Sequence, residues 1–338
     1  MKGFNTIKSI LTRNHPYHAQ WFITRKCNYR CKSCDVWQNQ DSRELSKYEI
    51  LYGLKELKDL GIAEITFSGG NPLLREDIGE ILKYASKYFV TTIYDNGSLA
   101  YKKVEILKHA DYVAISLDTL DEKKQDWLSG VRGSFREKMR SIKELVKNEI
   151  PVAISSTISQ VTRKDAIEMV ETFGKVKIPF NFSVYNYDPE SSQFAIGKKD
   201  EEFVIKERKE ITELFQELLE MKKNYPIFLP NKSIEIIKNY YEKGRNWECK
   251  AFDKFLTIDN LGRVSGCHLQ EPFTDIFHLK DFWYSKEAEE IRIKARKCKK
   301  CNYTCYISYS LPISNFLDPI LIEVKMNPRR VLKSFFHF

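Results

Sequence analysis

Three cysteines within eight residues constrain this chain more than any other feature: Cys27, Cys31 and Cys34, with the spacing C-x3-C-x2-C. A structural zinc ion takes four protein ligands, so these thiols alone would leave it one ligand short. A [4Fe–4S] cluster held by three thiolates instead keeps one iron open to a small molecule. The motif therefore predicts either a reactive iron–sulfur cluster or a metal site that a distant residue completes.

The other five cysteines lie in the last third of the sequence, at positions 249, 267, 298, 301 and 305. Residues 1–8 have neither the apolar core nor the small-residue cleavage site of a secretory signal. No stretch approaches the ~18 apolar residues of a membrane span. Thiols that are not exported stay reduced, so we expect a cytoplasmic protein whose cysteines bind metal.

The composition is that of a folded, mildly basic protein. Lysine and arginine number 55 against 46 aspartates and glutamates, which gives a formal net charge of +9. These charges are spread along the chain, so we expect a solvated surface and no nucleic-acid partner. Hydrophobic residues make up 42% of the 338, enough for one large domain and a smaller one.

Strand-like and helix-like segments alternate from residue 18 to residue 185. Ser46 and Glu49 form a capping box at the start of one predicted helix, Gly61 ends it, and Thr162 is expected to cap a later helix. Six strands are predicted, over residues 20–24, 63–68, 90–94, 112–118, 152–158 and 180–185. Such repeats form parallel strands with crossover helices, and six are fewer than a closed (β/α)8 barrel needs. We therefore predict an α/β fold, a partial (β/α)6 TIM-like barrel.

Polar residues and glycines collect where the predicted strands end. Cys27, Gly69, Asn96, Asp118 and Thr157 all fall at or near such ends. Because the sites of β/α barrels lie at the carboxyl ends of the strands, these residues are expected to share one site.

Five segments divide the chain. Residues 1–17 are a basic leader, 18–198 the barrel, 199–245 linker helices, 246–310 a cysteine-rich domain and 311–338 a basic, aromatic tail. The cysteine-rich domain is predicted to contain a β-hairpin over 255–266, a helix near 285–296 and a C-x2-C knuckle. A bound metal stabilises small modules of this kind, because they lack a sufficient core.

The cysteine pattern resembles that of radical S-adenosylmethionine (SAM) enzymes with a C-terminal auxiliary-cluster domain of the SPASM/twitch type. The resemblance covers roughly residues 18–310. Cys249 is followed by twelve residues, Gly262, four residues and Cys267, as in the auxiliary domains of that family. The full SPASM run of later cysteines is absent, so one auxiliary cluster is expected instead of two.

The resemblance implies specific ligands for the first cluster and for SAM. Cys27, Cys31 and Cys34 would hold a [4Fe–4S] cluster whose open iron binds SAM. The residues expected to contact SAM are Gly69, Gly70, Asn71, Asn96, Ser116, Asp118, Arg132 and Thr157. Two positions depart from the family pattern: Asn71 stands where a glutamate is usual in Gly-Gly-Glu-Pro, and Ser33 where an aromatic residue is frequent.

The resemblance also implies an auxiliary [4Fe–4S] cluster, with Cys249, Cys267, Cys298 and Cys301 as its ligands. Cys305 is either spare or replaces one of these four. A structural zinc held by four of the thiolates is the alternative. His268, beside a predicted ligand, is expected to be an ordinary core or surface residue or to lie behind the ligands.

The expected activity is reductive cleavage of SAM to a 5′-deoxyadenosyl radical, which then takes hydrogen from an unactivated C–H bond. A ferredoxin or flavodoxin would supply the electron. The leader and the tail suggest a protein peripheral to the membrane and a lipid or other apolar substrate. The alternatives are a ribosomal-peptide maturase, a sugar- or tetrapyrrole-modifying enzyme, and a zinc-stapled binding protein without catalytic activity.

Overall fold

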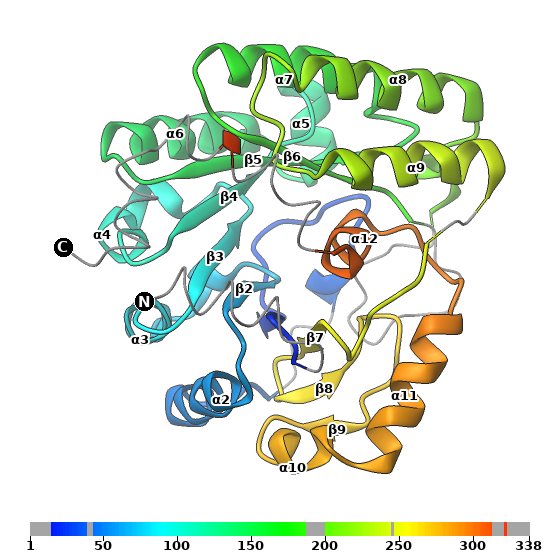
Figure 1. Cartoon of the computed structure of the whole chain (residues 1–338). Coiled ribbons are helices and arrows are strands. Elements are labelled where there is room, and N and C mark those ends of the chain that lie inside the picture. The colour runs from blue at the N-terminus through cyan, green and yellow to red at the C-terminus, as the bar shows by residue number, and fades with distance from the viewer. Residues whose placement is uncertain (1–14, 39–42, 187–199, 245–246, 313–320, 323–338) are drawn as a thin grey trace.

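Six parallel strands form the body of the fold, and the polypeptide crosses from each to the next through helices (Figure 1). The computed structural model describes residues 15–38, 43–186, 200–244, 247–312 and 321–322. The strands are β1 (His18–Thr24), β2 (Glu64–Gly69), β3 (Val90–Asp95), β4 (Tyr112–Ser116), β5 (Val152–Ile158) and β6 (Phe180–Val184). Each pairs with the next in parallel. The predicted open barrel is confirmed.

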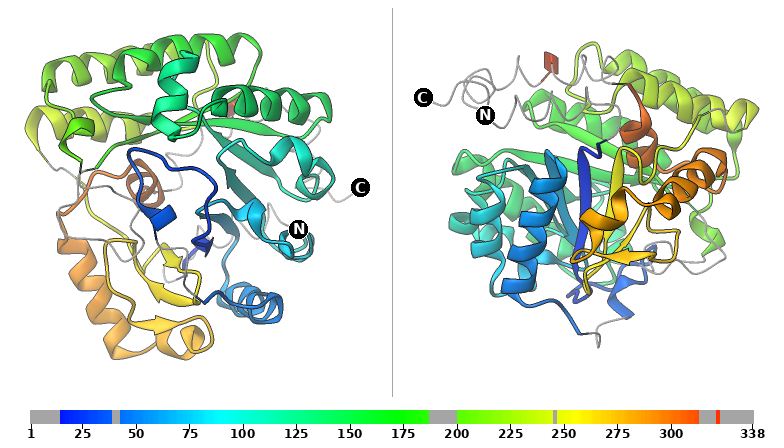
Figure 2. Two further views of the ribbon diagram at one scale, coloured as in Figure 1. Left: turned by 180° about the vertical axis from the view of Figure 1, so that it is seen from behind. Right: turned by 60° about the horizontal axis from the view of Figure 1, so that its bottom comes forward.

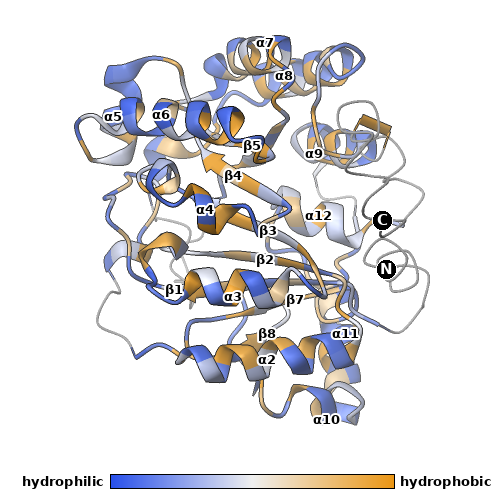
Figure 3. Ribbon diagram, turned by 90° about the vertical axis from the view of Figure 1, so that its left-hand side faces the viewer, coloured by the Kyte–Doolittle hydropathy of each residue, from blue (hydrophilic) through white to orange (hydrophobic). Residues whose placement is uncertain are grey.

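Helices cover the outer face of this curved sheet (Figure 2). They are α2 (Lys47–Leu60), α3 (Ile78–Ala85), α4 (Val104–Leu107), α5 (Glu122–Ser129), α6 (Ser134–Lys147), α7 (Ala166–Lys175), α8 (Arg208–Met221) and α9 (Asn231–Lys243). Short 3-10 turns are η1 (Val36–Gln38), η2 (Pro72–Leu74), η3 (Ala100–Lys102), η4 (Arg163–Asp165) and η5 (Glu201–Phe203). In the ribbon coloured by hydropathy (Figure 3), hydrophobic residues lie in the strands and alternate with hydrophilic residues along the helices, as is usual for half-exposed helices.

The core that joins sheet and helices fixes the strand register. Leu54 and Leu57 of α2 and Leu82 of α3 are fully buried in it with Phe67 of β2 and Ile93 of β3. In β3, buried and half-buried residues alternate. This period-two pattern is expected for a strand with one face against helices and one toward the barrel interior.

The capping signals are confirmed in one helix and wrong in another. Ser46 and Glu49 form the capping box of α2, and Gly61 ends that helix with a φ of 97°. Thr162 makes no capping hydrogen bond; its hydroxyl donates to the carbonyl of Thr157 at 2.6 Å. The Thr162 side chain therefore stabilises the bend after β5 and does not cap the helix as the sequence pattern predicts.

The cysteine-rich segment continues the sheet of the barrel. Strands β7 (Phe255–Ile258), β8 (Arg263–Ser265) and β9 (Thr274–Asp275) extend it beyond β1 to nine strands, in the order β6-β5-β4-β3-β2-β1-β7-β8-β9. β7 lies parallel to β1, with His18 opposite Phe255 and Trp21 opposite Ile258. The predicted hairpin is present as β7 and β8. Helices α10 (Leu279–Trp283), α11 (Lys286–Lys297) and α12 (Thr304–Ser310) complete the module.

Helix α12 lies beside the barrel and not on the outer surface of the module (Figure 1). It contacts β6 and α9. The Tyr309 ring stacks on His18 of β1 with 3.8 Å between ring centroids, and the Tyr306 ring stacks on Phe255. These contacts tie the last cysteines to the first strand of the chain.

Candidate active site

The cysteine loop, residues 25–34, follows β1 at the carboxyl edge of the sheet. The Arg30 amide donates to the Ser129 carbonyl at 3.0 Å, and the Lys32 amide donates to the Leu128 carbonyl at 2.9 Å. These residues end α5, so the loop is held by the helix that follows β4.

The two glycines at the end of β2 hold the other side of this loop. The Gly70 amide donates to the Thr24 carbonyl at 2.8 Å, and the Asn71 amide donates to the Lys26 carbonyl at 2.7 Å. A Cβ added at Gly69 would lie 2.1 Å from the Thr24 oxygen, and one at Gly70 would lie 2.1 Å from the Lys26 oxygen. The close approach of the cysteine loop therefore requires both glycines, a need that the sequence analysis attributed to SAM instead.

A network of amides surrounds the first cysteine. The Asn71 Nδ2 group donates to Asn96 Oδ1 at 3.1 Å and to Ser98 Oγ at 3.2 Å, and Asn96 Nδ2 donates to Asn28 Oδ1 at 2.9 Å. Asn96 Nδ2 also lies 3.8 Å from Cys27 Sγ. Asn71 is fully buried and its Oδ1 accepts from the start of η2. Asn71 thus orients the other amides, whereas Asn96 points to a predicted ligand.

The three thiols of the loop are half-buried and lie close enough for their charges to interact. Burial raises the pKa of Cys31 to about 11 and that of Cys34 to about 12, and it also raises the pKa of Cys27. Within the described part of the chain, no three His, Cys, Asp or Glu side chains converge tightly enough for one metal ion. Thiolates of a [4Fe–4S] cluster bind different irons and stand farther apart, so this donor set fits the cluster better than a single ion.

Lys138 is a site residue that the sequence analysis missed. It is 2% exposed, and its Nζ donates to the carbonyls of Asn96 at 2.8 Å and Ser116 at 2.7 Å, joining the ends of β3 and β4. Its ammonium lies 5.2 Å from the centre of the Tyr29 ring in the cysteine loop. Burial lowers the pKa of Lys138, and the nearby Cys31 and carboxylates oppose that effect.

A signal for Lys138 exists in the sequence. It occupies the inward stripe of α6 with Ile142 and Leu145, at the spacing i, i+4 and i+7. A lysine in an apolar stripe is a buried charge, and buried charges are paired or functional.

Asp118 and Thr157 come together as predicted from their places at strand ends. Asp118 Oδ1 accepts from the Thr157 amide at 2.7 Å, and the Asp118 amide donates to Gln125 Oε1 at 2.9 Å. Burial raises the pKa of the Asp118 carboxyl, while the Thr157 amide and Lys138 lower it. The ends of β4 and β5 are therefore fixed to each other beside Lys138.

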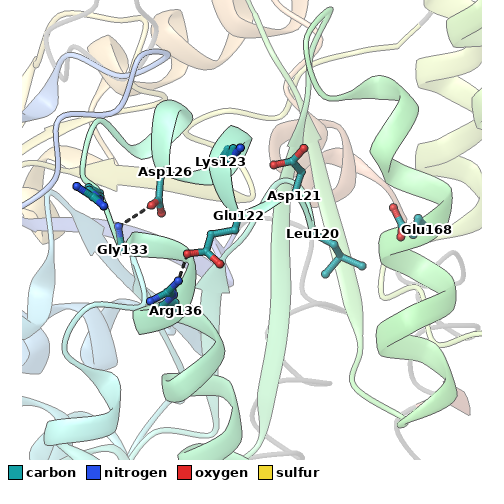
Figure 4. A pocket seen from close by; sticks show the side chains of 9 residues that line it. Leu120, Asp121, Glu122, Lys123, Asp126, Gly133, Arg136 and Glu168 are labelled. Atoms are coloured by element: carbon teal, nitrogen blue, oxygen red, sulfur yellow. Dashed lines mark hydrogen bonds and ion pairs between the residues drawn. The ribbon is translucent and has the colours of Figure 1, made fainter.

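Arg132 lies in a different environment from the other predicted SAM contacts. It is exposed and lines a surface pocket of about 1010 Å³ beside α5, α6 and α7 (Figure 4). That pocket contains an ion pair of Glu122 with Arg136 at 2.8 Å, and Asp126 there accepts from the Gly133 amide at 2.6 Å. Its lining is Leu120, Asp121, Glu122, Lys123, Asp126, Arg132, Gly133, Arg136 and Glu168. These residues include no cysteine and no other predicted SAM contact.

The second cysteine group surrounds a small cavity. Cys249, Cys267, Cys298 and Cys301 all line a space of about 90 Å³, the four that the sequence analysis chose as auxiliary ligands. They come from three separate stretches: the segment before β7, the end of the hairpin and the turn after α11. The four thiols do not converge on a point that would suit one zinc ion, whereas a cavity between them suits a cluster.

Cys305 is not on the lining of this cavity. It is on α12, where its charge would act on Tyr94 of β3 and on Tyr309. Burial raises the pKa of Cys305 to about 12. His268 is buried behind the cavity, 2.5 Å from the Tyr306 hydroxyl, and burial lowers its pKa to about 3.

Comparison with known proteins places the barrel in a family. Residues 21–179 match the model of the radical SAM superfamily. The sporulation killing factor maturation protein SkfB of Bacillus subtilis is 31% identical over 154 residues, 44% of this chain and 37% of that protein. A probable GTP 3′,8-cyclase of Pyrococcus horikoshii is 33% identical over 159 residues, 46% of this chain and 51% of that protein. The chain thus spans about half or less of the length of these relatives.

Solved structures share the fold over a longer stretch. Streptococcus suis SuiB bound to S-adenosylmethionine has a TM-score of 0.66 at 20% identity, covering 82% of this chain and 68% of that one. A structure of anSMEcpe with bound AdoMet has a TM-score of 0.61 at 14% identity, covering 95% of this chain and 99% of that one. The family match therefore identifies residues 21–179 as a radical SAM domain, and the solved structures show that its fold is shared.

Proposed function

We propose that this protein reductively cleaves SAM and uses the resulting 5′-deoxyadenosyl radical to take hydrogen from a C–H bond of a peptide substrate. The observation that carries the proposal is the cysteine loop held at the carboxyl edge of a radical SAM barrel, with a second four-thiol cavity on the same sheet. The superfamily uses a [4Fe–4S] cluster and SAM, and the thiol sets of both regions fit such clusters.

Different residues would hold the cluster and shape its surroundings. Cys27, Cys31 and Cys34 would hold the cluster, and its chemistry when bound is one-electron reduction of SAM to methionine and the 5′-deoxyadenosyl radical. The Asn96 amide orients toward Cys27 and can donate to a thiolate. Lys138 keeps the ends of β3 and β4 together and places a positive charge next to the thiolates.

The remaining predicted SAM contacts fall into three groups. Gly69, Gly70 and Asn71 act through the cysteine loop and the amide network. Ser116, Asp118 and Thr157 line the edge beside Lys138 and are the groups we propose for polar contacts with SAM. Arg132 is exposed in the pocket beside α5, whose lining includes no other predicted SAM contact, so we propose only a small effect of Arg132 on SAM binding.

A peptide substrate has more support than the lipid that the leader and the tail suggested. SkfB is named as a maturation protein, and SuiB has been solved with its precursor peptide SuiA. Residues 1–14 and 323–338, on which the lipid and membrane-surface predictions depend, lie outside the described residues. In the part of the chain that the structure describes, no helix has the length and apolarity needed to cross a bilayer.

The test is anaerobic reconstitution of the full chain with iron and sulfide. We expect about eight iron and eight sulfide per chain, the content of two four-iron clusters. With SAM and a chemical reductant the protein should form 5′-deoxyadenosine, detected by mass spectrometry. A library of candidate precursor peptides, including those encoded near its gene, should then yield a product with a mass change that depends on SAM. Colourless protein that binds zinc with high affinity would contradict the proposal.

A further inference from the structure

The turn that carries two predicted auxiliary cysteines, together with the end of the helix before it, is strongly basic. Residues 291–300 contain six basic residues and no acidic one. Lys294, Lys297, Lys299 and Lys300 are exposed. We call these four the basic knuckle. They come from the last turn of α11 and from the turn between Cys298 and Cys301 (Figure 1).

The positive charge of the basic knuckle is only partly neutralised. Neighbouring arginines have partners: Arg292 lies 3.3 Å from Glu289, and Arg296 lies 3.5 Å from Asp253. Among the described residues, no carboxylate lies within ion-pair distance of Lys294, Lys297 or Lys299. The acidic residues of α11 are in its first half, so the charges of this helix are segregated by position.

One residue of the basic knuckle borders the auxiliary cavity, next to the least buried of its four cysteines. Cys298 is half-buried, unlike the buried Cys249, Cys267 and Cys301, and Lys300 lines the cavity. Electron transfer between proteins requires the two redox centres to come close. The positive charge of the basic knuckle and the half-buried Cys298 therefore lie in the same small area of the surface.

We propose that the basic knuckle is the docking surface for a one-electron carrier protein whose redox centre is surrounded by carboxylates. The inference rests on the proposed function, because it requires a cluster in the auxiliary cavity. In the step itself the reduced carrier loses one electron, the oxidised cluster gains it, and no atom is transferred. Opposite surface charges increase the rate of such encounters, and salt screens the effect.

The experiment measures reduction of the reconstituted full chain by a reduced acidic flavodoxin in a stopped-flow spectrometer. The test variant is Lys294→Glu/Lys297→Glu/Lys299→Glu, which leaves Lys300 and the cavity lining unchanged. The control variant is Lys55→Glu/Lys83→Glu/Lys143→Glu, the same change of charge on exposed lysines of α2, α3 and α6. We expect the second-order rate of the test variant to fall at least about tenfold at low salt, and the loss to shrink at high salt.

A small cationic reductant separates docking from damage to the clusters. The methyl viologen radical cation should reduce the test variant no more slowly than the wild type, and SAM cleavage driven by it should be unchanged. A wild-type rate with flavodoxin, or an equal loss in the control variant, would overturn the docking proposal alone. So would weakened peptide binding without a change in the flavodoxin rate, which would assign the surface to the substrate. Wild-type protein that retains no iron would overturn the docking and the proposed function together.

Discussion

The two cysteine regions of this protein are built in opposite ways. The first has three thiols on one loop, and the barrel edge around it supplies amides, a buried lysine and polar strand ends. The second has four thiols from three stretches of chain around a small cavity. A three-thiol set leaves one iron of a cluster for a small molecule, whereas a four-thiol set leaves none. Under the proposed function, the first region would carry the chemistry, and the second would contribute electron transfer or stability.

Removing one thiol of the first region should have the largest effect on activity. We expect Cys31→Ala to lower the rate of SAM cleavage more than about 100-fold. This loss is larger than the one expected when a residue that only supports a metal ligand is removed. The barrel should still fold, because the loop is held by backbone hydrogen bonds to α5 and β2. Formation of 5′-deoxyadenosine and circular dichroism are the measurements. Activity near that of the wild type would show that this loop has no role in SAM cleavage.

Removing one thiol of the second region should cost stability and iron. Cys267→Ala is expected to lose about four iron per chain and to unfold at a lower temperature, because bound metal stabilises modules with small cores. Cys305→Ala is the control, since Cys305 is a half-buried cysteine of the same module that does not line the cavity. Iron analysis and thermal unfolding compare the two. An equal loss of iron in the control would make Cys305 a ligand.

Substitution of a glycine tests whether iron binding by the cysteine loop depends on its close contact with the end of β2. Gly70→Ala should reduce stability by roughly 1–3 kcal/mol through overpacking against the Lys26 carbonyl, and should weaken iron binding with it. Gly133→Ala is a control with open space, since no atom lies within 4 Å of its added Cβ, although its φ of 85° carries a conformational cost of its own. Denaturant unfolding and iron content distinguish the two. Full iron binding by Gly70→Ala would show that the loop does not need this approach.

The buried lysine should set the reduction potential of the first cluster. Lys138→Met removes a positive charge near the thiolates and should make reduction harder, by roughly 60 mV for a tenfold change in the one-electron equilibrium. Lys143→Met is the control, because Lys143 is exposed on the same helix. A redox titration followed by electron paramagnetic resonance gives both potentials. If Lys138 had only a structural role, the stability would fall without a shift of the potential.

The smallest effect is expected at Arg132. Its exposed position predicts that Arg132→Gln raises the KM for SAM by less than about fivefold, as removal of an exposed ion contact typically costs at most about 1 kcal/mol. Steady-state kinetics of SAM cleavage measure this. A much larger rise in KM would restore Arg132 as a ligand of the SAM carboxylate and would require the loop after α5 to move.

Local patterns were enough to predict the elements that lie on single stretches of chain. The capping box of α2, the six strands and the hairpin at Gly262 follow from residues near one another in sequence. Thr162 was misassigned because the same short-range signal serves a helix cap and a bend, and here the carbonyl of Thr157 takes its hydroxyl. Short-range signals compete wherever two backbone groups are within reach of one side chain.

The sequence by itself determined the three-thiol motif, the barrel class and the grouping of the four cysteines that line one cavity, since each depends on spacing along the chain. Only the tertiary structure decided that β7 continues the sheet at β1, that Cys305 lies off the cavity, and that Gly69 and Gly70 make room for the cysteine loop. It also brought Lys138, more than a hundred residues from Cys31 in sequence, to the edge that carries the thiols. The spacing of cysteines along the chain is enough to predict which of them group together. Contacts between distant segments depend on how the sheet and the helices pack.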